Sequence, residues 1–223
     1  MAKTLKKIHT IELIIILSII IPPAAIALFS HQLSRMSFSF LAVSTITRDL
    51  GYLLLILFLQ WRGNEPFSTI GLNFKKTGDE ILAGGFLFFP VYFLSVFIQK
   101  ALAEFGLLVP HITVPAIYEN RTIYQQILAI MLIFVVAITE ETIFRGYIYQ
   151  RLQEILANKA LAVFFSAILF ASGHSYQGIA GVIITGFLGL SLSLIFLWRG
   201  SLITPIVIHI LYDYIGFFIF PTR

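Results

Sequence analysis

The sequence contains no cysteine, and only 12% of its 223 residues are charged. The missing thiols exclude disulfide bridges, zinc ribbons, iron–sulfur clusters and cysteine nucleophiles, so any metal ligands would have to be His, Asp or Glu. The scarcity of charge excludes a water-soluble globular domain, because such domains carry about 25% charged residues. The sequence also has no internal repeat and no low-complexity run, which favours a single integral domain.

Apolar residues dominate instead, and they come in long blocks. Hydrophobic residues make up 58% of the chain, and 22 of them are Phe. Each block approaches the roughly 20 residues that a helix needs to cross a bilayer. The blocks lie at residues 11–30, 40–61, 81–102, 123–139 (continuing as a more polar helix to 156), 160–172, 179–198 and 202–220. The sequence therefore predicts an all-α fold, a polytopic membrane helical bundle of about seven transmembrane helices.

Basic residues are distributed very unevenly between the two sides of this predicted bundle. If the first block is a retained span, the segments on one side hold Lys3, Lys6, Lys7, Arg62, Lys75, Lys76, Arg151, Lys159 and Arg199. The segments on the other side hold only Arg35, Arg121 and Arg223, with Lys100 nearby. Because cytoplasmic loops are enriched in Lys and Arg, we predict a multi-pass protein of the cell membrane with a cytoplasmic N-terminus. The net charge of +4 thus reflects topology, and no nucleic-acid partner is expected.

Two adjacent acids follow the apolar run of the fourth block. Ionisable side chains inside a membrane are costly, so each of them needs a reason to be there. Glu141 and Arg145 are one helical turn apart and can pair, whereas Glu140 points about 100° away and need not be neutralised by Arg145. The alternative is that these residues only mark the boundary between membrane and water. By count, Glu140 lies toward the inner end of its span, which predicts access to it from the cytoplasm.

Two histidines lie in later blocks. His209 and Asp213 are spaced i, i+4 and share one face of a helix, as a reactive pair or as a buried pair that only holds helices together. His174 ends the fifth block, where a lone histidine is usually structural. A turn near residues 157–159 would place Glu140 and His174 at the same height, since each is 17 residues from Ala157. The same counting places His209 about 10 Å lower than Glu140, a gap that helix tilt or a deeper turn would have to close.

Together, three segments resemble the CAAX protease and bacteriocin-processing (Abi) family of intramembrane proteases. The segments are Glu140-Glu141-x-x-x-Arg145, Phe170-x-x-x-His174 and His209-x-x-x-Asp213. The resemblance covers about residues 123 to 220, and it implies that Glu141 and Arg145 form a structural pair. We therefore expect N-terminal membrane helices with a polar loop at 1–122 and a catalytic four-helix membrane core at 123–223, within one integral domain.

The same resemblance implies roles for four catalytic residues. Glu140 would be the general base that activates water, and His174 would help to hold that water. His209 and Asp213 would stabilise the oxyanion. The family usually has Asn at the last position, and Asp donates a hydrogen bond only when it is protonated. Asp213 could instead orient His209.

The predicted function is that of an intramembrane endopeptidase that hydrolyses a peptide bond with glutamate-activated water. The expected partners are a peptide or protein substrate, with or without a lipid group, and membrane lipid. Two His and one carboxylate also form a typical catalytic zinc set, so Glu140, His174 and His209 are the ligands if zinc is present. A mechanism that requires no cofactor is favoured, and zinc is the alternative.

Two other functions remain open. The first is a non-catalytic membrane protein that confers immunity or binds a peptide. The second is a proton-coupled transporter in which the His, Glu and Asp side chains act as a proton relay. The transporter is the weaker alternative, because the two halves of the sequence show no inverted repeat.

Overall fold

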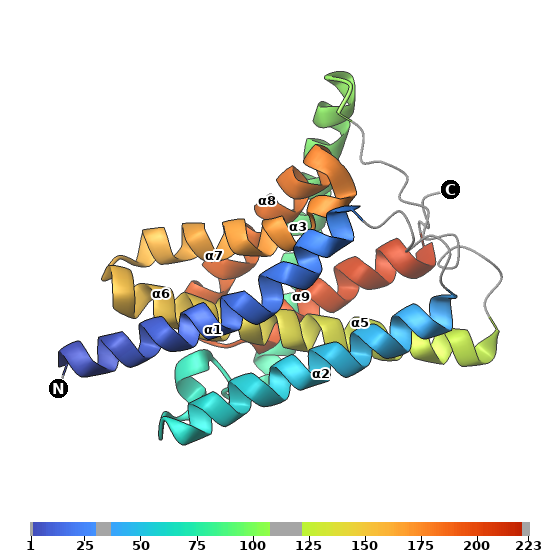
Figure 1. Cartoon of the computed structure of the whole chain (residues 1–223). Coiled ribbons are helices and arrows are strands. Elements are labelled where there is room, and N and C mark those ends of the chain that lie inside the picture. Colours follow the sequence, from blue (N-terminus) through green and yellow to red (C-terminus); the bar gives the residue numbers. More distant parts are fainter. Residues whose placement is uncertain (1, 30–36, 108–121, 220–223) are drawn as a thin grey trace.

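The computed structural model describes residues 2–29, 37–107 and 122–219, and within these ranges it contains helices and no strand. Figure 1 shows the long helices packed alongside one another as a bundle. The elements are α1 (Ala2–Phe29), α2 (Phe38–Arg62), η2 (Phe67–Ile70), α3 (Thr77–Glu104), α5 (Ile123–Glu141), η3 (Thr142–Ile148), α6 (Tyr149–Leu156), α7 (Lys159–Gly173), η4 (Ser175–Gln177), α8 (Gly178–Arg199), α9 (Ile203–Tyr214) and η5 (Ile215–Ile219). The predicted all-α membrane bundle is confirmed.

Among the described residues, four helices are long and apolar enough to cross a membrane. They are Phe38–Arg62, Thr77–Glu104, Ile123–Leu156 and Ser175–Arg199. Two shorter apolar helices, Lys159–Gly173 and Ile203–Ile219, lie between or after them. The protein is therefore a multi-pass membrane protein, while the count of seven spans stays a prediction.

Alternating helix directions give the bundle two ends. We call the end at which α1 begins the proximal end, and the opposite end the distal end. His9, near the start of α1, pairs with Glu65 just after α2 and with Glu154 near the end of α6. The α6–α7 turn therefore lies at the proximal end, as Figure 1 shows. The distal end holds the starts of α2, α5 and α8 and the ends of α3, α7 and α9.

The central element is a continuous helical rod from Ile123 to Leu156, 34 residues long, made of α5, η3 and α6. Thr122 and Gln125 start it with a capping box, in which each side chain bonds the other residue's backbone N–H. Ala157 ends it in a left-handed conformation, with φ of 53°. Its middle segment, η3, is a π-helix, and all seven residues of that segment are buried. A wide, buried turn of this kind is typical of functional positions in helices.

A close backbone approach joins this rod to the loop after α2. A Cβ atom on Gly146 would lie only 2.9 Å from the carbonyl oxygen of Ile70, so glycine is required where these backbones meet. The neighbouring residue Gly71 accepts a hydrogen bond of 3.0 Å from the backbone N–H of Leu202. Leu202 is fully buried beside Gly146. The turn that precedes α9 therefore lies deep inside the bundle.

This deep turn determines the height of His209. Leu202 lies level with Gly146, and His209 comes seven residues after Leu202 while Glu140 comes six residues before Gly146. At about 1.5 Å per residue the two side chains are then at nearly the same height. Counting residues along a simple hairpin gave a height difference of about 10 Å between Glu140 and His209. The depth of the turn removes this difference, and a deeper turn was one of the two explanations considered from the sequence.

A buried network of charges joins three elements at the proximal end. Arg151 of α6 is fully buried and binds both carboxylate oxygens of Glu65, at 2.9 and 3.0 Å. It also lies 3.3 Å from Glu12 of α1, which accepts a hydrogen bond of 2.9 Å from the Tyr147 hydroxyl. At the same end, Arg199 and Glu80 tie α8 to α3 with a contact of 2.7 Å.

Candidate active site

Glu141 lies at the centre of a buried cluster between the rod and α9. Its Oε1 atom accepts a hydrogen bond of 2.8 Å from Nη1 of Arg145, and it lies 2.8 Å from Nδ1 of His209. The Glu141 side chain is fully buried, and the Arg145 guanidinium lies 4.2 Å from the centre of the Phe170 ring. The Glu141–Arg145 pair that the spacing indicated is thus present, and it holds a histidine from a second helix as well.

The Glu141 contact also defines which nitrogen of His209 faces the rest of the site. Because the Glu141 oxygen already accepts a hydrogen bond from Arg145, it acts as a carboxylate, and Nδ1 of His209 is the donor to it. Nε2 then points to the other acids, 3.9 Å from Oε2 of Glu140 and 3.6 Å from Oδ2 of Asp213. These distances are too long for hydrogen bonds, so Nε2 lies near both acids without being bonded to either.

Glu140 has an oxygen whose hydrogen-bonding capacity is unused. Oε2 of Glu140 is buried, and within the described residues it accepts no hydrogen bond. A buried polar atom without a partner costs free energy, so a native structure normally supplies one. Water or a substrate group next to Nε2 of His209 would supply it. The neighbouring acid, Glu141, also has a buried Oε2 without a hydrogen bond from the described residues, but its Oε1 atom holds both Arg145 and His209 and so fixes that carboxylate in a buried ion pair.

His174 is oriented by the backbone of its own helix. Its Nδ1 atom lies 3.0 Å from the carbonyl oxygen of Phe170, and since a carbonyl only accepts, Nδ1 carries the hydrogen. Nε2 of neutral His174 is then a hydrogen-bond acceptor. The ring lies beside that of Phe170, with centroids 4.8 Å apart, at the point where α7 ends.

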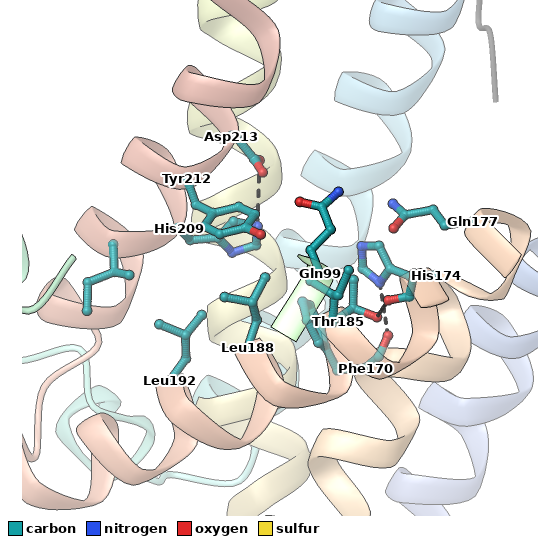
Figure 2. Close-up of a pocket in the computed structure, with 13 residues that line it drawn as sticks. Gln99, Phe170, His174, Gln177, Thr185, Leu188, Leu192, His209, Tyr212 and Asp213 are labelled. Carbon is teal, nitrogen blue, oxygen red and sulfur yellow. Dashed lines mark hydrogen bonds and ion pairs between the residues drawn. The ribbon is translucent and has the colours of Figure 1, made fainter. Parts of the chain in front are cut away.

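A cavity of about 210 Å³ joins three of the four predicted catalytic residues. It is lined by residues of α3, α7, η4, α8 and α9, namely Gln99, Phe170, His174, Gln177, Gly181, Ile184, Thr185, Leu188, Leu192, Ile208, His209, Tyr212 and Asp213. Figure 2 shows His209 and Asp213 on one side, His174 and Gln177 on the other, and Gln99 between them. Glu140 is not among the lining residues, and its carboxylate reaches the site beside the His209 imidazole.

The height of His174 differs from the count made on the sequence. The Ser166 hydroxyl donates a hydrogen bond of 2.6 Å to the carbonyl oxygen of Phe144, which sets α7 against the rod. Phe170 comes four residues after Ser166, and Glu140 comes four residues before Phe144. Because the two helices are antiparallel, Phe170, rather than His174, is level with Glu140. His174 lies about one turn closer to the distal end. The π-helix is the physical reason, since its wide turns do not advance as an α-helical count assumes.

Phe170 is a central residue to which sequence reasoning gave no role of its own. Its ring packs edge-on against Phe144 and His209, at centroid distances of 5.3 and 6.2 Å, and Arg145 lies over its face. Its carbonyl oxygen orients His174. The only signal in the sequence is its place four residues before His174.

Gln99 of α3 was also missed, although a lone glutamine among apolar residues of a membrane span is a usable signal. α3 precedes the part of the chain that carries the three motifs. Its glutamine nevertheless faces His174 and His209 across the cavity (Figure 2).

The described residues do not form an evident metal centre. No group of three or more of their His, Asp and Glu side chains is arranged to hold a metal ion. In the zinc set considered from the sequence, Nδ1 of His174 is bonded to a carbonyl and Nδ1 of His209 to Glu141, which is the usual second contact of a metal-binding histidine and leaves both Nε2 atoms as possible ligands. No hydrogen bond or ion pair among the described residues joins Glu140 to His174, and zinc stays the alternative to a cofactor-free site.

Comparison with known proteins gives one match. The model of the Rce1-like family, described as "Type II CAAX prenyl endopeptidase Rce1-like", matches residues 123–215, and this confirms the resemblance found from the three motifs. No curated protein and no solved structure matches the chain. The match begins where the predicted catalytic core begins. It contains all seven residues of the motifs and no residue of α1, α2 or α3. At the level of the family, this supports a membrane peptidase with a peptide substrate.

Proposed function

We propose that this protein is an intramembrane endopeptidase that hydrolyses a peptide bond with a water molecule activated by Glu140. One observation carries the proposal, the buried Oε2 atom of Glu140, which accepts no hydrogen bond from the described residues and lies 3.9 Å from Nε2 of His209. A general base must have a free lone pair within reach of the proton that it removes. Glu140 and Glu141 both have such an oxygen, but Oε1 of Glu141 is held by Arg145 and by Nδ1 of His209, whereas Glu140 lies beside Nε2, the nitrogen that faces the site.

In the proposed reaction, Glu140 accepts a proton from water while the water oxygen attacks the carbonyl carbon of the scissile peptide bond. The carbonyl oxygen becomes an oxyanion in the tetrahedral intermediate. The C–N bond then breaks, and Glu140 passes its proton to the leaving nitrogen. The products are a carboxylic acid and an amine, and Glu140 returns to its carboxylate form. Nε2 of His174, an acceptor, orients the attacking water.

His209 and Asp213 stabilise the oxyanion in this proposal. Glu141 holds Nδ1 of His209, so that Nε2 is directed into the site. In its imidazolium form His209 presents an Nε2–H to the oxyanion, and the carboxylate of Glu141 balances its charge. Asp213, 3.6 Å from Nε2 of His209, donates a second hydrogen bond to the oxyanion in its protonated form. A preformed donor of this kind is typically worth 10² to 10³ in rate.

The proposed substrate is a peptide or protein segment in the membrane environment. Because the cavity volume is about 210 Å³, and a water molecule takes up about 30 Å³ of liquid, there is room for a peptide bond and one large side chain. A lipid group on the substrate would lie in the bilayer, outside this space. The proposal therefore applies to substrates with or without such a group.

The test is cleavage of internally quenched peptides, prenylated and unmodified, by the purified protein in detergent. Wild type is compared with Glu140→Gln and with the matched control Glu104→Gln, an exposed glutamate at the end of α3. We expect Glu140→Gln to lower the rate by about 10² to 10⁴ and the control to leave it unchanged. A strong chelator is expected to have no effect on wild type.

Three outcomes would count against the proposal. Full activity of Glu140→Gln would remove the glutamate from the reaction. Loss of activity in the chelator would indicate a metal-dependent reaction. If no peptide is cleaved and Glu140→Gln keeps full function in cells, the protein is a binding or immunity protein.

A further inference from the structure

We infer that, among the residues that the structure describes, the catalytic cavity opens only toward the distal end of the bundle and that this end faces away from the cytoplasm. The substrate peptide then reaches Glu140 from the extracytoplasmic side of the membrane. This inference rests on the proposed function only where it calls the molecule that enters the cavity a substrate. Its structural content, the side from which the cavity is accessible, is independent of catalysis.

The polar residues of the cavity come from helix ends that lie at the distal end. Gln99 is five residues before the end of α3, Gln177 immediately precedes α8, and Asp213 is the last residue but one of α9. Figure 2 shows these three side chains around the cavity, with Leu192 at its other end. The cavity is thus polar toward the distal end and apolar toward the middle of the bundle.

Fully buried side chains close the cavity toward the proximal end. Ile208 lies at the cavity wall. Thr204, one turn closer to the proximal end, and Leu202, just before α9, are both 0% exposed. Tyr147 and Ile148 of the rod are equally buried at this level. Beyond Thr204, which donates a hydrogen bond of 3.1 Å to the Glu80 carbonyl, the Glu80–Arg199 contact ties the helices together. A peptide that came from the proximal end would have to displace this packing.

Exposed aromatic residues mark the depth of the site in the membrane. Trp61 and Trp198 are both about two-thirds exposed at the proximal ends of α2 and α8. Tyr176 and Tyr214 are exposed at the distal end. Tyr and Trp gather at the two membrane–water interfaces, and the 22 residues from Tyr176 to Trp198 span about 33 Å, close to the hydrocarbon thickness of about 30 Å.

On this scale the reactive groups lie near the distal interface. Asp213 is next to Tyr214, and His209 is only five residues, or about 8 Å, further into the membrane. Leu192, at the apolar end of the cavity, is 14 residues beyond Gly178, the first residue of α8, which is about 21 Å along that helix. The cavity therefore extends from the distal interface into the membrane and ends before the proximal one.

The charges indicate which interface is cytoplasmic. The lysines at the proximal end, in α1, in the loop before α3 and at the start of α7, are Lys6, Lys7, Lys75, Lys76 and Lys159. In the distal half of the described residues, Lys100 is the one lysine, and the one arginine is Arg48, which is paired with Asp49. Because Lys and Arg are enriched on the cytoplasmic side, the proximal end is assigned to the cytoplasm. The cavity then opens on the extracytoplasmic side.

This result reverses the access expected from the sequence. That expectation treated Glu140 as lying near the inner end of its span. In the structure, the rod continues for 16 residues beyond Glu140, to Leu156, so Glu140 lies near its middle. The substrates that fit are exported peptides and the extracytoplasmic segments of membrane proteins, whereas a chain end in the cytoplasm has no path to the base.

The absence of cysteine makes a direct test possible, because single cysteines can be introduced into the wild-type chain without background. Gln177→Cys and Gln99→Cys place a thiol at the cavity mouth from two different helices. Lys75→Cys and Lys159→Cys are matched controls at the proximal end. Each variant also carries Glu140→Gln, and intact cells are treated with a membrane-impermeant maleimide before and after permeabilisation.

We expect the mouth cysteines to be labelled to the same extent before and after permeabilisation, and the proximal cysteines to be labelled only afterwards. The reverse pattern, or equal labelling of all four in intact cells, would overturn the inference. Mouth cysteines that react only after denaturation would show that the cavity is closed at the distal end, which also overturns it. If one mouth variant fails to accumulate, the other carries the test.

A second readout separates this inference from the proposed function. In the background with Glu140 intact, blocking Gln177→Cys with a bulky impermeant maleimide on intact cells is expected to abolish cleavage of a quenched peptide added outside. If labelling follows the expected pattern but no variant or wild type cleaves any peptide, the proposed function fails and the access assignment stands. If peptides are cleaved only when they are presented at the proximal face of inside-out vesicles, the access assignment fails alone.

Discussion

Glu141 holds His209 through a contact of 2.8 Å between its Oε1 atom and the Nδ1 atom of the imidazole. The same oxygen accepts a hydrogen bond from Arg145, while Oε2 of Glu141 is buried and accepts none from the described residues. A single oxygen atom thus connects the rod to α9 and defines the tautomer of the histidine. The two adjacent acids are therefore expected to behave differently when they are changed.

Glu141→Gln is expected to lower the stability of the protein, whereas Glu140→Gln is not. The neutral amide leaves the buried Arg145 without its counter-charge, and breaking a buried pair in this way typically costs about 3 to 5 kcal/mol. Thermal unfolding of the two purified variants in the same detergent measures the difference. Equal melting temperatures for Glu141→Gln and wild type would show that the pair does not hold the rod and α9 together.

His174→Gln and His174→Asn separate the two nitrogens of this ring. The Asn amide can replace the Nδ1 donor to the Phe170 carbonyl, but it places no polar atom where Nε2 faces the cavity. The Gln amide can reach the Nε2 position. We therefore expect both variants to fold and His174→Gln to retain more peptidase activity than His174→Asn, measured as kcat/KM. The opposite order would assign His174 a purely structural role.

Asp213→Asn tests whether the side chain at this position acts as a hydrogen-bond donor. Glu141 already orients His209, so Asp213 is not needed for that purpose. An asparagine amide can donate to the oxyanion, and we expect Asp213→Asn to keep most of the activity while Asp213→Ala loses about 10² in kcat. Equal losses in both variants would indicate that the negative charge beside His209 is what matters.

Arg151→Met is expected to destabilise the proximal end without acting on the chemistry. Arg151 is fully buried between Glu65 and Glu12, and its removal leaves Glu65 with His9 and Glu12 with the exposed Arg62 as their basic partners, at a cost of about 3 to 5 kcal/mol. The activity per folded molecule should stay at the wild-type value. Lys159→Met, an exposed change at the same end, is the control. A specific activity that falls in proportion to stability would mean that the network also shapes the site.

The candidate site residues could be selected from the sequence because each is an ionisable group on an apolar helix, where it stands out from its neighbours. The i, i+4 spacing of Glu141 and Arg145 was sufficient to indicate their contact, which is local. The meeting of Glu140 with His209 is not local. It depends on the deep turn before α9, which is set by the contacts of Gly71 and Gly146 with distant residues, and no periodicity in the sequence encodes those contacts.

The proximal network shows a second limit. His9, Glu12 and Glu65 read as ordinary polar residues at the ends of apolar blocks, and nothing in their spacing connects them to Arg151. Their partners lie more than 50 residues away in the chain, so the pairing becomes visible only when the helices are packed.

The shortness of α7 has a consequence for the supply of water. α7 has 15 residues and is therefore about 22 Å long, less than the hydrocarbon core of about 30 Å that its neighbours cross. A bilayer accommodates such a mismatch by thinning locally or by admitting polar groups. His174 lies where this short helix ends, so headgroups and their water are expected to dip toward the cavity at that point. Hydrolysis consumes one water per bond, and the bilayer itself, deformed beside α7, would deliver it to the base.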